Sequence, residues 1–131
     1  MATVDTNSEL GQQIVADAKQ YVLHSWSVQD AVNPIPVAGG EGRYFWDYDG
    51  KRYLDFASQL VNLSLGHQHP KLVAAIQEQA GRLCTIAPSL ANDKRSELAR
   101  LCAEVMPGDL NHTFFTNGGA EANENAIKLA R

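Results

Sequence analysis

The chain has 131 residues, of which 44% are hydrophobic and 20% are charged, a balance typical of a globular protein and unlike that of a disordered one. Its formal net charge of -4 disfavours nucleic acid as a partner but leaves a local anion site possible. No apolar run approaches the roughly 20 residues of a membrane helix, and no signal peptide is visible. We therefore expect a cytoplasmic protein with no membrane contact.

The first half of the chain predicts one helix and one hairpin. Apolar residues recur at helical spacing over 8–23, and Ser8 stands where an N-cap is expected. Prolines and glycines in 31–42 argue against a regular element there. Residues 43–56 form two aromatic-rich stretches around an Asp-Gly pair, which predicts a hairpin. Residues 57–69 have no clean period and predict a partly buried loop.

The second half alternates helical and strand-like patterns. Helices are predicted over 70–83, where a proline suits the first turn, and over 93–106, which a Pro-Gly pair ends. A strand is predicted over 112–116, and another helix runs from 119 to 131. Alternation of this kind favours an α/β layer. A single strand cannot make a sheet, which suggests that the chain is a piece of something larger.

Cysteine and histidine residues give little sign of a metal site. Cys84 and Cys102 each lie in a helical pattern, and we interpret them as buried reduced thiols rather than a disulfide or a metal pair. His67 and His69 are close in sequence, but no nearby side chain completes a zinc set. His69 precedes a proline and is better interpreted as a helix-entry residue. We expect no metal.

The glycines before the last helix form the most informative motif. A strand that enters a helix through Gly118 and Gly119 can aim successive N–H groups, with that of Ala120, at one phosphate. Glycine also permits close approach and a positive φ. The sequence matches neither the Walker A pattern nor the G-x-G-x-x-G pattern. From spacing alone, an ordinary tight turn remains an open alternative.

Three blocks of the sequence resemble the class III aminotransferases, which are fold-type-I enzymes that use pyridoxal 5'-phosphate. "FFTNGGAEANENAIKLAR" resembles their first phosphate-binding segment. "GGEGRYFWDYDGKRYLDF" is similar to their N-terminal β-hairpin, and "LGHQHPKLVAAIQEQ" to the entry into the first helix of the large domain. The blocks follow the family's order and cover nearly all of the chain from Val22 onward.

The resemblance implies an α/β fold, namely the N-terminal part of the fold type I transferase fold. Residues 1–65 would form an N-terminal segment with a helix and a β-hairpin, belonging to the small domain. Residues 66–131 would form the incomplete start of the large cofactor-binding domain. The family precedent also implies a homodimer with shared active sites.

The resemblance assigns the cofactor phosphate to the closing segment. The backbone N–H groups of Gly119 and Ala120 would hold the phosphate of pyridoxal 5'-phosphate, and Gly118 would shape the turn. Many relatives have Ser or Thr at the position of Ala120, where the hydroxyl donates to the phosphate. This chain lacks that donor, so another group or a water molecule has to compensate.

Other positions correspond to substrate contacts in the family. Trp26, Leu60 and Val61 match residues that line the substrate pocket. Ala87 and Pro88 match a loop that reaches the partner's active site across the dimer interface. From the residues alone, Leu60 and Val61 could equally be ordinary core, and Trp26 could pack on the hairpin.

The implied activity is transamination. An amine or ω-amino acid such as taurine, β-alanine or 4-aminobutyrate would donate an amino group to a 2-oxo acid, pyruvate or 2-oxoglutarate. The Schiff-base lysine that this reaction needs would lie beyond Arg131, since Lys128 falls within the helix after the phosphate turn, where it either faces solvent or pairs with Glu124 at i,i+4 spacing. The 131-residue chain is therefore expected to be inactive alone. The alternative is a truncated, non-enzymatic homologue that binds a partner or has a structural role.

Overall fold

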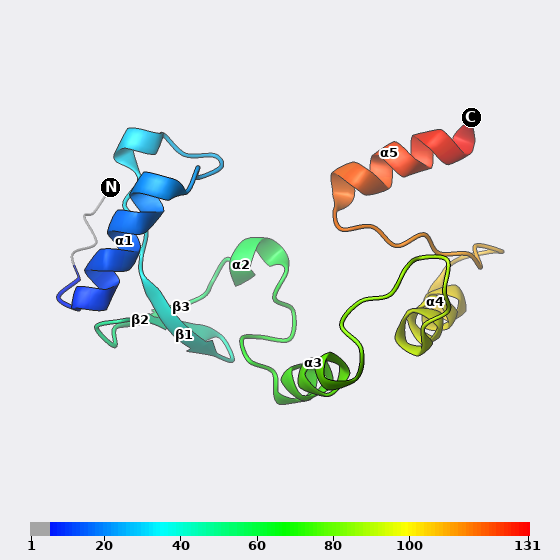
Figure 1. The fold of residues 1–131 in the computed structure, drawn as a ribbon, viewed down its shortest axis with the longest axis horizontal. Coiled ribbons are helices and arrows are strands. Elements are labelled where there is room, and N and C mark those ends of the chain that lie inside the picture. Colours follow the sequence, from blue (N-terminus) through cyan, green and yellow to red (C-terminus); the bar gives the residue numbers. More distant parts are fainter. Residues whose placement is uncertain (1–5) are drawn as a thin grey trace. The chain divides into compact units, whose positions relative to one another are not determined.

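A computed structural model of the chain describes residues 6–131. Residues up to Arg82 form one compact unit and Leu83–Arg131 form another, and each is considered by itself. The domain boundary expected after residue 65 remains a prediction about the complete fold. The elements in chain order (Figure 1) are α1 (Glu9–Tyr21), the 3-10 helix η1 (Gln29–Ala31), β1 (Val37–Glu41), β2 (Tyr44–Asp47), β3 (Arg52–Leu54), α2 (Ser58–Val61), α3 (Pro70–Arg82), α4 (Asp93–Val105) and α5 (Gly119–Ala130).

The first helix begins where the sequence predicts it. The Ser8 side chain accepts a hydrogen bond from the Gly11 N–H at 3.2 Å, so Ser8 is confirmed as the N-cap. The Asp49 carboxylate accepts from the backbone N–H groups of Asn7 and Ser8, at 3.1 and 3.0 Å. Gly11 is buried, and a Cβ on it would lie 3.4 Å from the Pro36 ring. The start of α1 is thus fixed to the hairpin turn and packs closely on residue 36.

The sheet of the first unit has three antiparallel strands in the order β1-β2-β3. The hairpin predicted over 43–56 is confirmed as β2 and β3. The prediction that 31–42 holds no regular element is wrong, because β1 lies there. Glycine does not break β1, because it makes room for an aromatic ring: a Cβ on Gly39 would lie 2.9 Å from the Trp46 ring. The sequence pattern cannot reveal that cross-strand contact.

The hairpin turn is organised by one buried carboxylate. Asp47 is 4% exposed and accepts hydrogen bonds from the Asp49 N–H, the Lys51 N–H and the Tyr53 hydroxyl, at 3.0, 2.9 and 2.8 Å. Burial raises the pKa of Asp47, but the bonds from Tyr53 and the backbone outweigh it and leave the pKa below its ordinary value. Gly50 has a φ of 79°, the conformation that the Asp-Gly signal predicts.

In the second unit the helices are confirmed and the strand is not. Asn92 caps α4 by accepting from the Arg95 N–H at 3.1 Å. Residues 112–116 carry no strand, although their composition predicts one. A strand needs a hydrogen-bonded neighbour, and the described part of the chain contributes none to this segment. The α/β layer therefore lacks its sheet within these residues.

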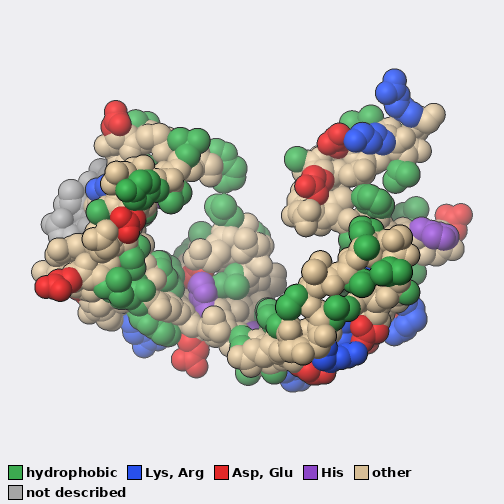
Figure 2. All heavy atoms as spheres, in the orientation of Figure 1, with side chains coloured by type: hydrophobic (Ala, Val, Ile, Leu, Met, Phe, Trp, Pro, Cys, Tyr) green, Lys and Arg blue, Asp and Glu red, His purple; other side chains and the backbone are tan. Residues whose placement is uncertain are grey.

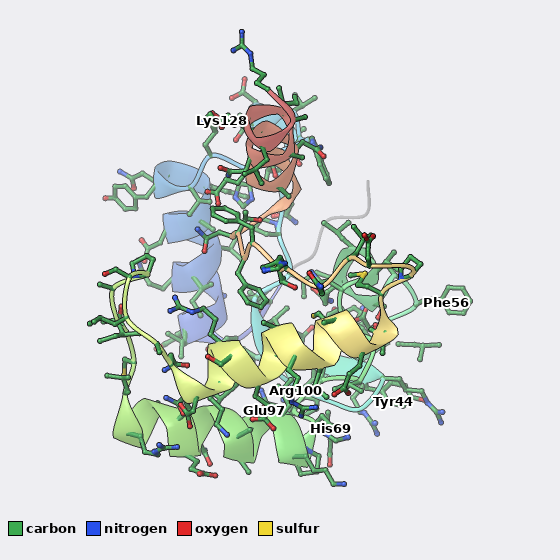
Figure 3. All side chains as sticks on the ribbon, turned by 90° about the vertical axis from the view of Figure 1, so that its right-hand side faces the viewer. Tyr44, Phe56, His69, Glu97, Arg100 and Lys128 are labelled. Atoms are coloured by element: carbon green, nitrogen blue, oxygen red, sulfur yellow. The ribbon has the colours of Figure 1, made fainter. Side chains whose placement is uncertain are left out.

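Apolar side chains remain exposed in both units. Among the described residues only Gly11, Pro36 and Asp47 are buried, and Figure 2 shows hydrophobic atoms across the visible surface. Phe56 stands clear of the ribbon in Figure 3. Cys84 is exposed and Cys102 half-buried, so the predicted burial of Cys84 is wrong for this chain. No described helix is long and apolar enough to span a membrane.

Candidate functional site

The start of α5 is a pre-formed helix N-terminus. Gly118 is the N-cap in an extended conformation, with φ -172° and ψ 171°, and its carbonyl accepts the first helical bond from the Ala122 N–H at 3.0 Å. The Glu121 carboxylate reaches back to accept from the backbone and side-chain N–H groups of Asn117, at 3.0 and 3.3 Å. This arrangement follows the logic of a capping box, displaced by one residue. It orders the turn that leads into the helix.

Two N–H groups of this turn face no protein acceptor. In the described part of the chain, no hydrogen bond is found for the N–H groups of Gly119 and Ala120, as expected for the first residues of a helix. Neither Gly118 nor Gly119 has a positive φ, and a Cβ on either would meet nothing within 4 Å. Glycine is therefore required neither by the backbone conformation nor by packing within the chain. What the two glycines leave is room for an external group to approach the N–H donors.

The segment predicted as a loop contains a left-handed turn. Residues 58–61 all have positive φ, between 48° and 65°, and form α2. A left-handed conformation costs roughly 1–2 kcal/mol for each residue other than glycine, so surrounding contacts must hold this turn. Leu60 and Val61 lie on it and are 72% and 86% exposed. Within this chain they are not core residues.

Asp55 supplies contacts that hold the turn. Its carboxylate accepts from the Gln59 backbone N–H at 3.3 Å and from the Gln59 side-chain amide at 3.0 Å. It also accepts from His67 Nε2 at 2.8 Å, and the two side chains are only 5% and 18% exposed. The bonds from Gln59 lower the pKa of Asp55; burial opposes them and the bond from His67 supports them, for a net decrease. Sequence reasoning missed this pair, because nothing in the spacing of Asp55 and His67 announces a contact.

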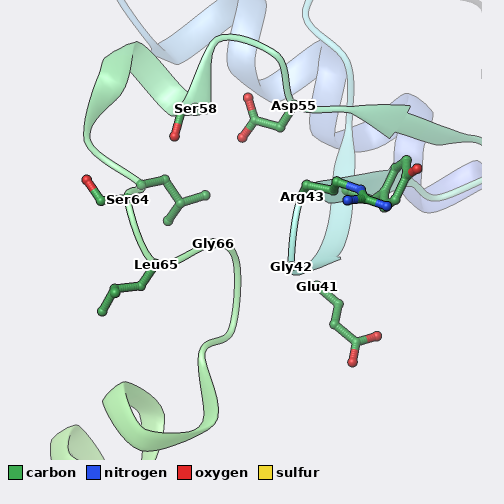
Figure 4. Close-up of a pocket in the computed structure, with 10 residues that line it drawn as sticks. Glu41, Gly42, Arg43, Asp55, Ser58, Ser64, Leu65 and Gly66 are labelled. Carbon is green, nitrogen blue, oxygen red and sulfur yellow. The ribbon is translucent and has the colours of Figure 1, made fainter.

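A pocket of about 530 Å³ lies beside this turn. Its wall includes the β1–β2 connection at Gly42 and Arg43, and the segment that leads to Gly66. In Figure 4 the Asp55 carboxylate points toward the turn that begins at Ser58. Leu60 and Val61 do not contribute to this lining.

Trp26 lies in the connection after α1. It has a φ of 57° and is exposed, and it lines a pocket of about 400 Å³. The connection is held by Gln29, which accepts from the His24 N–H at 2.9 Å and donates to the Ser27 carbonyl at 2.9 Å. Trp26 shares this pocket with neither Leu60 nor Val61. The three predicted substrate-lining residues therefore share neither of these two pockets, and their common role stays a prediction.

The predicted partner loop is folded against the start of α4. The Leu90 N–H donates to the Ala87 carbonyl at 3.0 Å, which closes a tight turn around Pro88. The Arg95 guanidinium donates to the Pro88 carbonyl at 3.2 Å and also to the Leu90 carbonyl. Ala87 and Pro88 are exposed, and a helix-borne cation fixes their backbone.

Comparison with known proteins decides the family. The sequence profile of "Aminotransferase class-III" matches residues 26–131, well over half of the chain, and the match includes both the left-handed turn and the glycines before α5. This chain belongs to the class-III aminotransferases. The expected resemblance is thereby confirmed.

The class-III chain is similar to several curated enzymes. Acetylornithine aminotransferase of Caldanaerobacter subterraneus is 49% identical over 113 residues, which are 86% of this chain and 27% of that protein. The 5-aminovalerate aminotransferase DavT of Pseudomonas aeruginosa is 41% identical over 102 residues, 76% of this chain and 24% of the relative. The chain thus spans about a quarter of the length of these relatives.

Solved structures of transaminases share the fold. Taurine:2-oxoglutarate aminotransferase from Bifidobacterium kashiwanohense, in complex with PLP and glutamate, matches with a TM-score of 0.87 and 43% identity, over 100% of this chain and 28% of that one. An (S)-enantioselective omega-transaminase from Thermomicrobium roseum matches with a TM-score of 0.86 and 37% identity, over 100% of this chain and 29% of that one. The expected fold, the N-terminal part of fold type I, is confirmed.

Proposed function

We propose that this class-III chain binds the phosphate of pyridoxal 5'-phosphate, as part of an enzyme that transfers an amino group from an amine or ω-amino acid to a 2-oxo acid. The observation that carries the proposal is the start of α5. In the described part of the chain, the N–H groups of Gly119 and Ala120 have no acceptor, and a Cβ on Gly118 or Gly119 would meet nothing within 4 Å. The helix dipole favours an anion at this end. When bound, the cofactor supplies the electron sink that amino-group transfer needs.

The donor set fits a phosphate group with one side-chain donor fewer than is common in the family. Two backbone N–H groups and the helix end remain, and charge-assisted bonds of this kind contribute on the order of 1.5–3 kcal/mol each. Ala120 offers no hydroxyl. One oxygen of the Glu121 carboxylate accepts hydrogen bonds from the backbone and side-chain N–H groups of Asn117.

The proposed donor class rests on the relatives. Their names include acetylornithine, 5-aminovalerate, succinylornithine and taurine. Each of these compounds carries a primary amine at a distance from an acidic group. We extend that chemistry to this protein, with taurine, β-alanine and 4-aminobutyrate as the donors to test, and with pyruvate and 2-oxoglutarate as the acceptors.

We also propose that the lysine that bonds the cofactor is supplied by residues outside this chain. Lys128 lies nine residues after Gly119, roughly 13 Å along the helix. It forms an ion pair with Glu124 at 2.7 Å, one of the two arrangements that the sequence leaves open. Neither its place on α5 nor its partner suits a residue that reaches the cofactor aldehyde.

We also propose a homodimer, on the basis of the loop that matches the family's partner-contacting segment. The loop that contains Ala87 and Pro88 is exposed and its carbonyls are held by Arg95. A loop fixed in this way is suited to reaching into a second subunit.

The proposal is tested by filling the space at the start of α5. In the natural-length protein, Gly119→Val should raise the dissociation constants of pyridoxal 5'-phosphate and of inorganic phosphate at least tenfold, measured by equilibrium dialysis. Gly81→Val is the matched control, because a Cβ at Gly81 of α3 likewise meets nothing within 4 Å. Equal affinities in the two variants would contradict the assigned cradle.

A further inference from the structure

We propose that Asp55, held in place by His67, is a positioning residue that keeps residues 58–61 left-handed and so fixes where Leu60 and Val61 project. The unusual feature is the run of positive φ itself, from 48° at Gln59 to 65° at Val61. No glycine relieves it. A run of this kind persists only where its surroundings over-determine it.

The turn has backbone hydrogen bonds of its own, from the Val61 N–H to the Ala57 carbonyl and from the Asn62 N–H to the Ser58 carbonyl, both at 3.0 Å. Asp55 adds three further hydrogen bonds at the start of the turn. Asp55 accepts from both the backbone and the side chain of Gln59, at 3.3 and 3.0 Å. The Ser58 N–H donates to the Asp55 carbonyl at 3.4 Å. Asp55 therefore contacts both residues at the start of the turn.

Asp55 is itself fixed from the sheet side. Its N–H donates to the Arg43 carbonyl at 2.9 Å, in the connection between β1 and β2. The next residue back in that connection, Gly42, exchanges two backbone hydrogen bonds with His67, at 2.9 and 2.7 Å. Asp55 and His67 are thus anchored to adjacent residues of one rigid turn, and their side chains meet at 2.8 Å.

The glycines around His67 show how closely this anchor is packed. A Cβ on Gly40 would lie 2.9 Å from the imidazole ring. Gly66 has a φ of 82°, and a Cβ there would lie 2.8 Å from the Gly42 carbonyl oxygen. The centroids of the Phe45 and His67 rings are 6.3 Å apart. His67 therefore has little freedom to move, and it can orient the Asp55 carboxylate.

The consequence for substrate choice rests on the proposed function. Leu60 and Val61 are exposed and correspond to pocket residues of the family. In a right-handed turn their side chains would point elsewhere, because the sign of φ reverses the side-chain direction relative to the backbone. Asp55 would thus set donor specificity through the turn, without touching the substrate.

The test compares three variants of the natural-length protein. Asp55→Ala should abolish the left-handed run in a crystal structure and raise KM for taurine or 4-aminobutyrate by about ten- to a hundredfold, since small misplacements have effects of that size. KM for the 2-oxo acid should change in the same direction, whereas cofactor affinity should stay unchanged. Asp49→Ala is the matched control, because Asp49 also accepts backbone N–H bonds but holds the start of α1.

A rescue variant separates positioning from a general loss of stability. Glycine adopts positive φ without steric cost. The double variant Gln59→Gly with Asp55→Ala should therefore restore the left-handed turn and bring KM for the amino donor most of the way back to its original value. Retention of the turn in Asp55→Ala, or a failure of the glycine to restore it, would overturn the proposal. If the unsubstituted protein turned over no amino donor, the proposed function would fail, and the φ values of residues 58–61 would still decide the role of Asp55.

Discussion

At the scale of single residues, glycine has a different structural role at each of several positions. Gly50 has the positive φ that its position in an Asp-Gly turn predicts. Gly118 and Gly119 do not, although the sequence also allows a positive φ there. Gly39 has no positive φ either, but a side chain there would collide with the Trp46 ring that covers it. The same residue type thus serves a turn, an open approach and a ring contact.

The missing hydroxyl at position 120 leads to a prediction at this scale. Ala120→Ser should preserve or tighten the binding of pyridoxal 5'-phosphate, because it adds a donor beside two backbone N–H groups. The dissociation constant in the natural-length protein measures this. Ala122→Ser, in the same helix and beyond the first two N–H groups, is the control. A clear rise in the constant for Ala120→Ser would count against the assigned phosphate position.

At the scale of elements, helices α1, α3, α4 and α5 begin where local signals predict. Ser8 and Asn92 cap α1 and α4 through side-chain acceptors, and the His69 carbonyl accepts from the Val73 N–H at 3.0 Å as α3 begins. This confirms His69 as a helix-entry residue. The strand predicted over 112–116, by contrast, does not form within the described residues. Helical hydrogen bonds are local, whereas a strand depends on a neighbour.

The hairpin permits a pH prediction at this scale. The lowered pKa of Asp47 means that its carboxylate stabilises the folded hairpin above the unfolded pKa, and that this contribution is lost as the pH falls through the lower folded value. Tyr53→Phe removes one donor to that carboxylate. The pKa of Asp47 should rise toward its unfolded value, so the variant should be less stable at neutral pH and should lose less stability as the pH falls. Urea unfolding at neutral pH and between about pH 2 and 5 measures both effects.

Tyr44→Phe is the control for that experiment. Tyr44 lies on the neighbouring strand β2, and its ring lies 4.4 Å from the Arg52 guanidinium, while its hydroxyl makes no hydrogen bond within the described residues. Its removal should leave the acid profile unchanged. Identical profiles for both tyrosine variants would show that the Tyr53 hydroxyl does not control Asp47.

At the scale of the whole molecule, the exposed apolar surface is the dominant feature. Helices α3, α4 and α5 expose the hydrophobic residues that their sequence period places on one face, among them Ile76, Leu98 and Ile127. Exposed apolar faces of this kind mark surfaces that other protein covers. The chain spans about a quarter of its relatives, which is consistent with cover from further residues. A partner-binding fragment would have the same faces.

Part of a transaminase and a partner-binding fragment differ in the activity that we expect of them. We predict that the 131-residue chain alone forms no product from an amino donor and a 2-oxo acid, and that borohydride traps no cofactor on a specific lysine. The natural-length protein, or the chain combined with a second chain that carries the lysine, should do both. Activity of the chain alone would refute this division, and inactivity of every combination would favour the partner-binding alternative.

The sequence by itself determined helices α1, α3, α4 and α5, the hairpin and the family. Each of these depends on residues close together in the chain, where spacing, capping and turn chemistry act directly. Only the tertiary structure revealed β1, the left-handed turn at 58–61 and the contact between Asp55 and His67. These features depend on residues brought together by the sheet and its connections, and a one-dimensional pattern carries no record of such neighbours.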